Sequence, residues 1–330
     1  MAETESIQKM AELASQEIFS VVGWEHLKLM NQNWVCCEPK KHRKQKGVKT
    51  HPSDAVFKYL DPYSGEDIYV NADLKSYAKS TLKSTEFTKT LRDLGHSTEC
   101  AGKSSDWKAL FVDQTRNHAV IGMLFVYNHD GGYDKDFGGE LGSISPSKLE
   151  FDPATFVGVV GPQRVIYLNS LTKDLKGLQA DGLLPEKKHR WFVFPHLSRS
   201  GAIHKLSPSV SLGTLLSPLL IVGYEFPVTT NEPSDHSGKW HRFRGLYAYY
   251  DGTGSSIQEF KYLLDYFFKY QLADERTQIV VNMIFPQEHA AAVFSWPKRS
   301  MPKITGPAPK TAKKSFKLCS EKSSFDTCSQ

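Results

Sequence analysis

The segment HPSDAVFKYLDPYSGEDIYVNADLKSYA, residues 51–78, alternates between apolar and polar positions, which predicts a β-hairpin. Pro62 suits the first central position of a type I turn, and Gly65 can adopt the left-handed conformation that closes a four-residue loop. Asp61 then lies opposite Glu66, and the pairing continues outward from there. One face of the hairpin is apolar throughout and belongs in a core. Its side chains are those of Ala55, Phe57, Tyr59, Ile68, Val70, Ala72 and Leu74.

The rest of the chain shows helical and strand patterns in turn. Apolar residues at intervals of three and four predict helices at residues 5–31, 85–101, 164–182 and 255–272, the last capped by Ser255 or Ser256. Gly23 predicts a bend or a break in the first helix. Runs of β-branched and aromatic residues predict strands at residues 34–37, 118–128, 155–162, 190–195, 219–226, 245–251 and 278–285. Residues 38–52 are polar, end in a proline and predict a loop.

Strands that alternate with helices indicate an α/β architecture with a mixed sheet, or with two sheets. The chain has 330 residues, which is enough for two modest domains. We expect a first domain at residues 1–180 and a second α/β region at residues 181–302 that serves recognition or partner binding. Residues 303–330 are rich in proline, lysine and serine without periodicity, and predict a basic disordered tail.

The composition argues against a membrane-spanning, secreted or disulfide-rich protein. A hydrophobic content of 40% can fill a core, and no run approaches the ~20 apolar residues that a membrane span requires. The acidic, polar N-terminus does not resemble a secretory signal. The five cysteines show no CxxC spacing, so neither a disulfide framework nor a zinc ribbon is indicated, and a reducing cytoplasm is the expected compartment. A net charge of +5 permits a polyanionic partner without requiring one.

The second face of the hairpin carries charged side chains that do not stabilise the pairing of its strands. In the predicted register Asp54 lies opposite Asp73, and Lys75 follows on the same side of the strand. Carboxylates directly across a ladder lie about 4.5–5.5 Å apart at Cβ and repel each other, unless a cation bridges them or one is protonated. Mg²⁺ prefers a few carboxylate oxygens together with water and substrate phosphate. The alternative is that Asp54 caps the strand entry while Asp73 and Lys75 form a solvated edge, and one β-bulge would shift the register.

The motifs P-S-D at residues 52–54 and D-L-K at residues 73–75 resemble those of the PD-(D/E)XK nuclease superfamily, with a serine between the proline and the aspartate. The order of helix, strand, hairpin, helix and strand over roughly the first 130 residues is similar too. The resemblance implies a restriction-endonuclease-like core, followed here by a second α/β region. It also implies that Asp54 and Asp73 bind Mg²⁺ or Mn²⁺ and that Lys75 positions or activates the attacking water.

Many members of that superfamily use a further glutamate from the first helix. Glu17 and Glu25 are the two candidates here, and Glu17 is preferred because it lies in the more regular part of the helix. The implied activity is divalent-metal-dependent hydrolysis of nucleic-acid phosphodiester bonds, serving restriction, phage defence or repair. One alternative is a catalytically inactive nucleic-acid-binding or assembly subunit with a nuclease-like fold. Another is a scaffold or sensor partner in a multi-protein system.

A basic stretch precedes the proposed site and contains no acid between Glu38 and Asp54. It is expected to contact phosphates, with a solvated loop as the equally weighted alternative. The partner expected is nucleic acid, DNA ahead of RNA, with a homodimer or a partner subunit of a defence system as further assemblies. The candidate nucleic-acid-binding residues are Lys40, Lys41, Arg43, Lys44, Lys46, Lys49 and His51.

Overall fold

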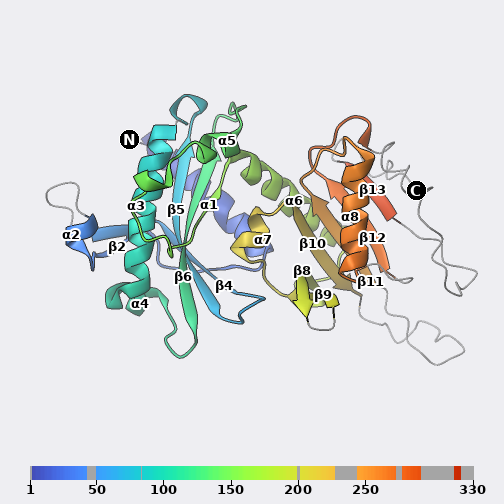
Figure 1. Ribbon diagram of the computed structural model, residues 1–330, viewed down its shortest axis with the longest axis horizontal. Helices are drawn as coiled ribbons and strands as arrows, with labels where there is room; N and C mark the ends of the chain where they lie inside the picture. Colours follow the sequence, from blue (N-terminus) through green and yellow to red (C-terminus); the bar gives the residue numbers. More distant parts are fainter. Residues whose placement is uncertain are drawn as a thin grey trace, which may run out of the picture. The chain divides into compact units, whose positions relative to one another are not determined.

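The computed structural model describes residues 2–42, 50–82, 84–198, 201–226, 244–272, 277–290 and 316–320 (Figure 1). The chain divides into two compact units. The N-terminal unit comprises residues 1–172 and 209–216, and the C-terminal unit comprises residues 173–208 and 217–330. The boundary falls within helix α6 (Pro162–Ala180), whereas the sequence placed it at the last residue of that helix.

The N-terminal unit is built on a five-stranded mixed sheet in the order β1-β4-β5-β6-β7. Strands β1, β4 and β5 pair antiparallel, and β5, β6 and β7 pair parallel. This sheet with its flanking helices is the α/β core that the sequence predicts. The strand bounds are Glu25–His26, Ala55–Leu60, Asp67–Tyr77, His118–Asn128 and Val157–Val160.

Helices α1 (Ala2–Val21) and α3 (Ser84–Lys103) cover opposite faces of this sheet (Figure 1). Phe19 of α1 packs edge-on against Phe125 of β6, with ring centroids 5.8 Å apart. The neighbouring Leu124 belongs instead to the apolar cluster that includes Leu94 of α3. Because successive residues of a strand point to opposite faces, each helix has its own core to cover.

The first helix ends ten residues earlier than the sequence predicted, at Val21 rather than at residue 31. Gly23 adopts φ +86°, and the N–H of Trp24 bonds to the carbonyl of Phe19 at 2.8 Å. This closure by a left-handed glycine is a common helix end, and it allows the chain to leave the helix axis and form β1.

Part of the predicted loop at residues 38–52 is ordered structure. Strand β3 (Thr50–Ser53) pairs antiparallel with β2 (Gln32–Val35) in a separate two-stranded sheet, and α2 (Pro39–His42) lies between them in sequence. The loop prediction was wrong for these residues because the buried side chains of β3 are His51 and Ser53, which give no apolar alternation. Residues 43–49 lie outside the described residues.

The hairpin of β4 and β5 has the predicted register. Val56 pairs with Asn71 and Lys58 with Tyr69. In the turn, the carboxylate of Asp61 accepts the backbone N–H groups of Tyr63 and Ser64, both at 2.9 Å. Gly65 adopts φ +73°, so the four-residue loop closes as the sequence predicts.

The C-terminal unit contains a six-stranded sheet in the order β13-β12-β11-β10-β8-β9, in which β11, β12 and β13 run parallel. Helix α8 (Ile257–Lys269) packs its apolar side against this sheet, and the hydroxyl of Ser256 caps it by accepting the N–H of Glu259 at 3.2 Å. The bounds of β8 to β13 are Arg190–Ser198, Gly201–Ser207, Leu219–Glu225, Arg244–Tyr250, Thr277–Met283 and Phe316–Ser320.

Strand β13 lies in the segment that the sequence predicted to be a disordered tail. Its Phe316 pairs with Ile279 of β12, so this short piece forms part of the sheet. Residues 303–315 and 321–330 lie outside the described residues. The remaining α-helices are α4 (Ser105–Phe111), α5 (Phe137–Gly142) and α7 (Leu212–Leu216). Among the described helices, none is both long and apolar enough to cross a bilayer.

Candidate active site

Asp54, Asp73 and Lys75 meet at one end of the five-stranded sheet. Asp54 lies between β3 and β4, while Asp73 and Lys75 lie on the same side of β5. The ammonium nitrogen of Lys75 is 3.6 Å from Oδ2 of Asp54 and also contacts Oδ1 of Asp73. The structure therefore brings the three residues together, as the hairpin register requires.

Hydrogen bonds hold Asp54 and the residue before it in place. Oδ2 of Asp54 accepts the backbone N–H of Leu74 at 3.0 Å. The buried hydroxyl of Ser53 donates to Oδ1 of Asn71 at 2.7 Å and accepts the indole N–H groups of Trp34 and Trp107, both at 3.2 Å. This hydroxyl thus uses its one proton and both lone pairs, which ties β3 to β5 and α4 directly beside the acid.

The two acids line a cavity of about 360 Å³ between the sheet, the small β2–β3 sheet and α3. Asp73 pairs with Leu124 of β6, so both point to the face that α3 covers. Through this cavity the two carboxylates remain accessible to a ligand. The cavity is lined by Cys36, His42, Thr50, His51, Pro52, Asp54, Asn71, Ala72, Asp73, Lys89, Arg92, Asp93, Leu94, His96 and Ser97.

The charges in this cavity shift each other's protonation. Burial and the nearby charge of Asp54 raise the pKa of Asp73 to about 7, against the opposing effect of Lys75. Burial lowers the pKa of Lys75, but Asp73 and Asp54 outweigh it and hold that pKa above its usual range. Lys75 is therefore an ammonium ion, and it partly neutralises a carboxylate pair that is costly to ionise.

The donor set fits a hard divalent cation. The side chains of Asp54 and Asp73 are 17% and 20% exposed, so their oxygens are accessible from the cavity without being fully hydrated. The ammonium of Lys75 stands where a positive charge is favoured, beside both carboxylates. Two carboxylates with room for water and phosphate match the preference of Mg²⁺ and Mn²⁺ for oxygen ligands.

Neither candidate glutamate of the first helical segment lines this cavity. Glu17 is exposed on α1, which covers the opposite face of the sheet from Asp73. Glu25 is exposed in β1, opposite Lys58. A third carboxylate from Glu17 or Glu25 stays a prediction, and the position of α1 lends it no support.

The candidate nucleic-acid-binding residues are only partly described. Lys40 is exposed on α2, and the ammonium of Lys41 on the same helix lies 2.6 Å from the carboxylate of Glu99. His51 lines the cavity but is buried, and burial lowers its pKa to about 4, so it is a neutral imidazole. The other residues predicted for this role, Arg43, Lys44, Lys46 and Lys49, lie outside the described residues.

Two basic residues that the sequence analysis did not select also line the cavity. Lys89 and Arg92 come from α3, one helical turn apart on the same side. Their spacing is visible in the sequence, but it does not reveal which side of that helix faces the acids. They add positive charge to the lining of the cavity that also holds Asp73.

The fold and the motif together identify the N-terminal part of the chain. Residues 1–164 match the family described as the GAPS4 protein PD-(D/E)XK nuclease domain. No curated protein matches the chain. The matched range includes the whole five-stranded sheet together with Asp54, Asp73 and Lys75. The family is thus shown for the N-terminal part of the chain: residues 1–164 match a PD-(D/E)XK nuclease domain.

Proposed function

We propose that this protein is a divalent-metal-dependent nuclease that hydrolyses nucleic-acid phosphodiester bonds. The observation that carries the proposal is the meeting of Asp54, Asp73 and Lys75 in one open cavity. A structural salt bridge would need only one acid for one lysine. The second acid has a raised pKa, so its ionised form destabilises the folded protein when no cation is bound. Binding of a cation would remove this cost.

Asp54 and Asp73 would hold Mg²⁺ or Mn²⁺. When bound, the cation stabilises charge on the phosphate and lowers the pKa of water. Lys75 stays protonated and donates hydrogen bonds to the attacking water or to a phosphate oxygen, which stabilises charge that develops in the transition state. The hydrogen bond from the backbone of Leu74 keeps Asp54 oriented towards this position.

Lys89 and Arg92 supply positive charge on the α3 side of the cavity. Contacts of this kind bind phosphates regardless of base sequence and weaken as salt increases. Lys40 is exposed on α2, and His42 at the end of this helix lines the cavity. DNA is the first substrate to test and RNA the second, and such cleavage would serve restriction, phage defence or repair equally well.

The decisive experiment incubates the full chain with supercoiled plasmid, linear duplex DNA, single-stranded DNA and RNA, with Mg²⁺, with Mn²⁺ and with chelator. We expect cleavage only with metal. The Asp73→Ala and Asp54→Ala variants should each lose cleavage by about 100-fold or more, because each removes a ligand of the cation. The matched control is Asp106→Ala, an exposed aspartate on α4 that does not line the cavity.

The same experiment separates the alternatives. Metal-independent nucleic-acid binding without cleavage in any metal would indicate a non-catalytic binding or assembly subunit. The absence of both binding and cleavage would indicate a scaffold or sensor role and would contradict the proposal. Equal cleavage by Asp73→Ala and wild type would place the chemistry elsewhere in the chain.

A further inference from the structure

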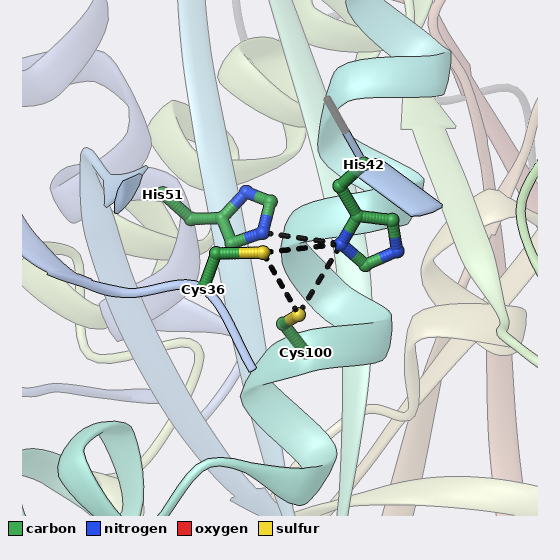
Figure 2. A group of neighbouring side chains, drawn as sticks. All are labelled: Cys36, His42, His51 and Cys100. Atoms are coloured by element: carbon green, nitrogen blue, oxygen red, sulfur yellow. Dashed lines mark hydrogen bonds between the residues drawn. The ribbon is translucent and has the colours of Figure 1, made fainter. Parts of the chain in front are cut away.

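Two cysteines and two histidines from four segments of the N-terminal unit point toward one another (Figure 2). Cys36 follows β2, His42 ends α2, His51 lies on β3 and Cys100 lies on α3. Their ligand atoms, the two Sγ atoms, Nδ1 of His42 and Nε2 of His51, all lie within 4.8 Å of one another. Figure 2 shows these atoms converging on a common centre.

The distances between these atoms are those of a tetrahedron around a zinc ion. With Zn–S bonds of about 2.3 Å and Zn–N bonds of about 2.0–2.1 Å, tetrahedral angles give about 3.8 Å for S to S, about 3.3 Å for N to N and about 3.5 Å for S to N. The Sγ atoms of Cys36 and Cys100 are 3.8 Å apart, and the facing nitrogens of His42 and His51 are 3.3 Å apart. Nδ1 of His42 lies 3.5 Å from Cys36 Sγ and 3.3 Å from Cys100 Sγ.

The surroundings of the cluster suit a bound dication. Cys36, His51 and Cys100 are buried, and the side chain of His42 is 2% exposed. Two thiolates balance the charge of Zn²⁺, so a Cys₂His₂ site is neutral as a whole, which favours its burial. Hydrogen bonding alone would leave two weak thiol donors and two imidazoles, packed edge to face, in the interior.

The histidine of α2 also has the outer contact that metal-binding histidines commonly have. Nε2 of His42 is buried without a hydrogen-bond partner, and the nearest carboxylate oxygen, Oε2 of Glu99, lies 3.7 Å away. A small rotation would let the N–H donate to this carboxylate and fix Nδ1 as the ligand atom. Lys41 and Lys103 already neutralise Glu99, which makes Glu99 an orienting group and a poor ligand.

We propose that Cys36, His42, His51 and Cys100 bind a structural zinc ion. Four protein ligands leave no open position, so the ion would stabilise the fold and take no part in the reaction. It would fasten α2 and the small β2–β3 sheet to α3. Since His51 lies three residues before Asp54, the ion would also fix the strand that delivers Asp54 to the cavity.

Cys37 provides both a rival outcome and a matched control. It is exposed, yet its Sγ lies 3.0 Å from Cys100 Sγ, so a Cys37–Cys100 disulfide would compete with the zinc site for the same thiol. A zinc site needs Cys36 and does not need Cys37. A disulfide needs Cys37 and does not need Cys36.

The test purifies the full chain in reducing buffer without added metal and measures zinc by mass spectrometry. We expect about one zinc per chain in the wild type, in Cys37→Ser and in Asp73→Ala, because neither substitution removes one of the four proposed ligands. The Cys36→Ser, Cys100→Ser and His51→Asn variants should retain less than about a tenth of that amount. Because removal of a ligand to a structural ion can also unfold the protein, wild-type protein is exchanged with Co²⁺ as well, which should give the intense visible bands of a tetrahedral site with two thiolates.

Three results would overturn the proposal. The first is a folded wild-type protein that contains no zinc and gives no tetrahedral Co²⁺ spectrum. The second is zinc retained in Cys36→Ser but lost in Cys37→Ser, which would exclude the ligand set. The third is a Cys37–Cys100 disulfide in peptide mapping of protein prepared without thiol-reducing agents. Wild-type protein that contains one zinc per chain but cleaves no nucleic acid would count against the proposed function and leave the zinc site standing.

Discussion

Asp73 lies in a partly buried position beside Asp54, where its ionised form is unfavourable in the absence of a bound metal ion. Its pKa is raised from 3.8 to about 7, chiefly by burial. The folded protein thus holds this proton more tightly than the unfolded chain does. The contribution of this carboxyl to stability is complete below about pH 4 and is lost as the pH rises through about 7.

The Asp73→Asn variant should therefore be more stable than the wild type in metal-free buffer at pH 8, by about 1–3 kcal/mol, and equally stable near pH 4. Urea denaturation across this pH range measures the difference. Mn²⁺ should raise the stability of the wild type more at pH 8 than at pH 5 and leave Asp73→Asn unchanged. The Asp106→Asn variant should follow the wild type throughout. A less stable Asp73→Asn at pH 8 would contradict the assigned shift.

At the scale of single residues, the sequence was sufficient to predict that Asp54, Asp73 and Lys75 lie together, because all three belong to one hairpin whose register is local. It did not predict that Lys89 and Arg92 line the cavity, because that depends on the side of α3 that faces the sheet. The Cys₂His₂ cluster was missed for the same reason. Cys100 follows His42 by 58 residues, so no short motif joins the ligands.

Among the elements, β3 combines a polar sequence with a buried position. Its Ser53 is 2% exposed and bonds to two indoles and one amide. Removing such a hydroxyl leaves several polar groups unpaired in the interior, which costs more than the loss of one hydrogen bond.

We expect Ser53→Ala to lower the free energy of unfolding by about 2–4 kcal/mol. Chemical denaturation gives this value, and the cleavage rate should fall as well, because Asp54 follows directly in the chain. The matched control is Ser80→Ala, an exposed serine outside the cavity, which should change neither. A change below about 0.5 kcal/mol in Ser53→Ala would mean that the hydroxyl does not hold this strand.

The elements that the sequence predicted well are those whose limits are set by neighbouring residues. The turn at Pro62 and Gly65 fixed the hairpin, and β6 has the predicted bounds. The first helix was extended too far because apolar residues continue after Gly23, while the conformation of that glycine ends the helix. Strand β3 was missed because tertiary burial of His51 and Ser53 replaced the usual apolar signal.

For the whole molecule, the N-terminal unit is discontinuous in sequence, which no local pattern indicates. Residues 209–216 return to it after the chain has entered the other unit. The backbone of Val210 donates to the carbonyl of Val22 at 3.0 Å and accepts the indole N–H of Trp24 at 2.6 Å. Leu212 is 1% exposed, and its N–H bonds to the hydroxyl of Tyr59.

The Leu212→Ala variant should destabilise the N-terminal unit by about 2–5 kcal/mol, because a buried leucine leaves a cavity when it is truncated. The matched control is Leu206→Ala, a leucine of the C-terminal unit that is 47% exposed and should have little effect. Thermal unfolding of both variants can be followed by tryptophan fluorescence, to which Trp24 of the N-terminal unit contributes. Equal melting temperatures of the two variants would mean that residues 209–216 do not contribute to the stability of the N-terminal unit.

The pairing of Lys75 with both acids also affects how tightly the proposed metal site can bind a divalent cation. An incoming cation must displace an ammonium group that is covalently tethered and therefore never diffuses away. Because the ammonium group of Lys75 competes for the same carboxylates, it lowers the apparent affinity of the site for any divalent ion. If the protein is the nuclease proposed above, its activity would therefore depend on the concentration of free divalent metal, because the ion would not be held permanently.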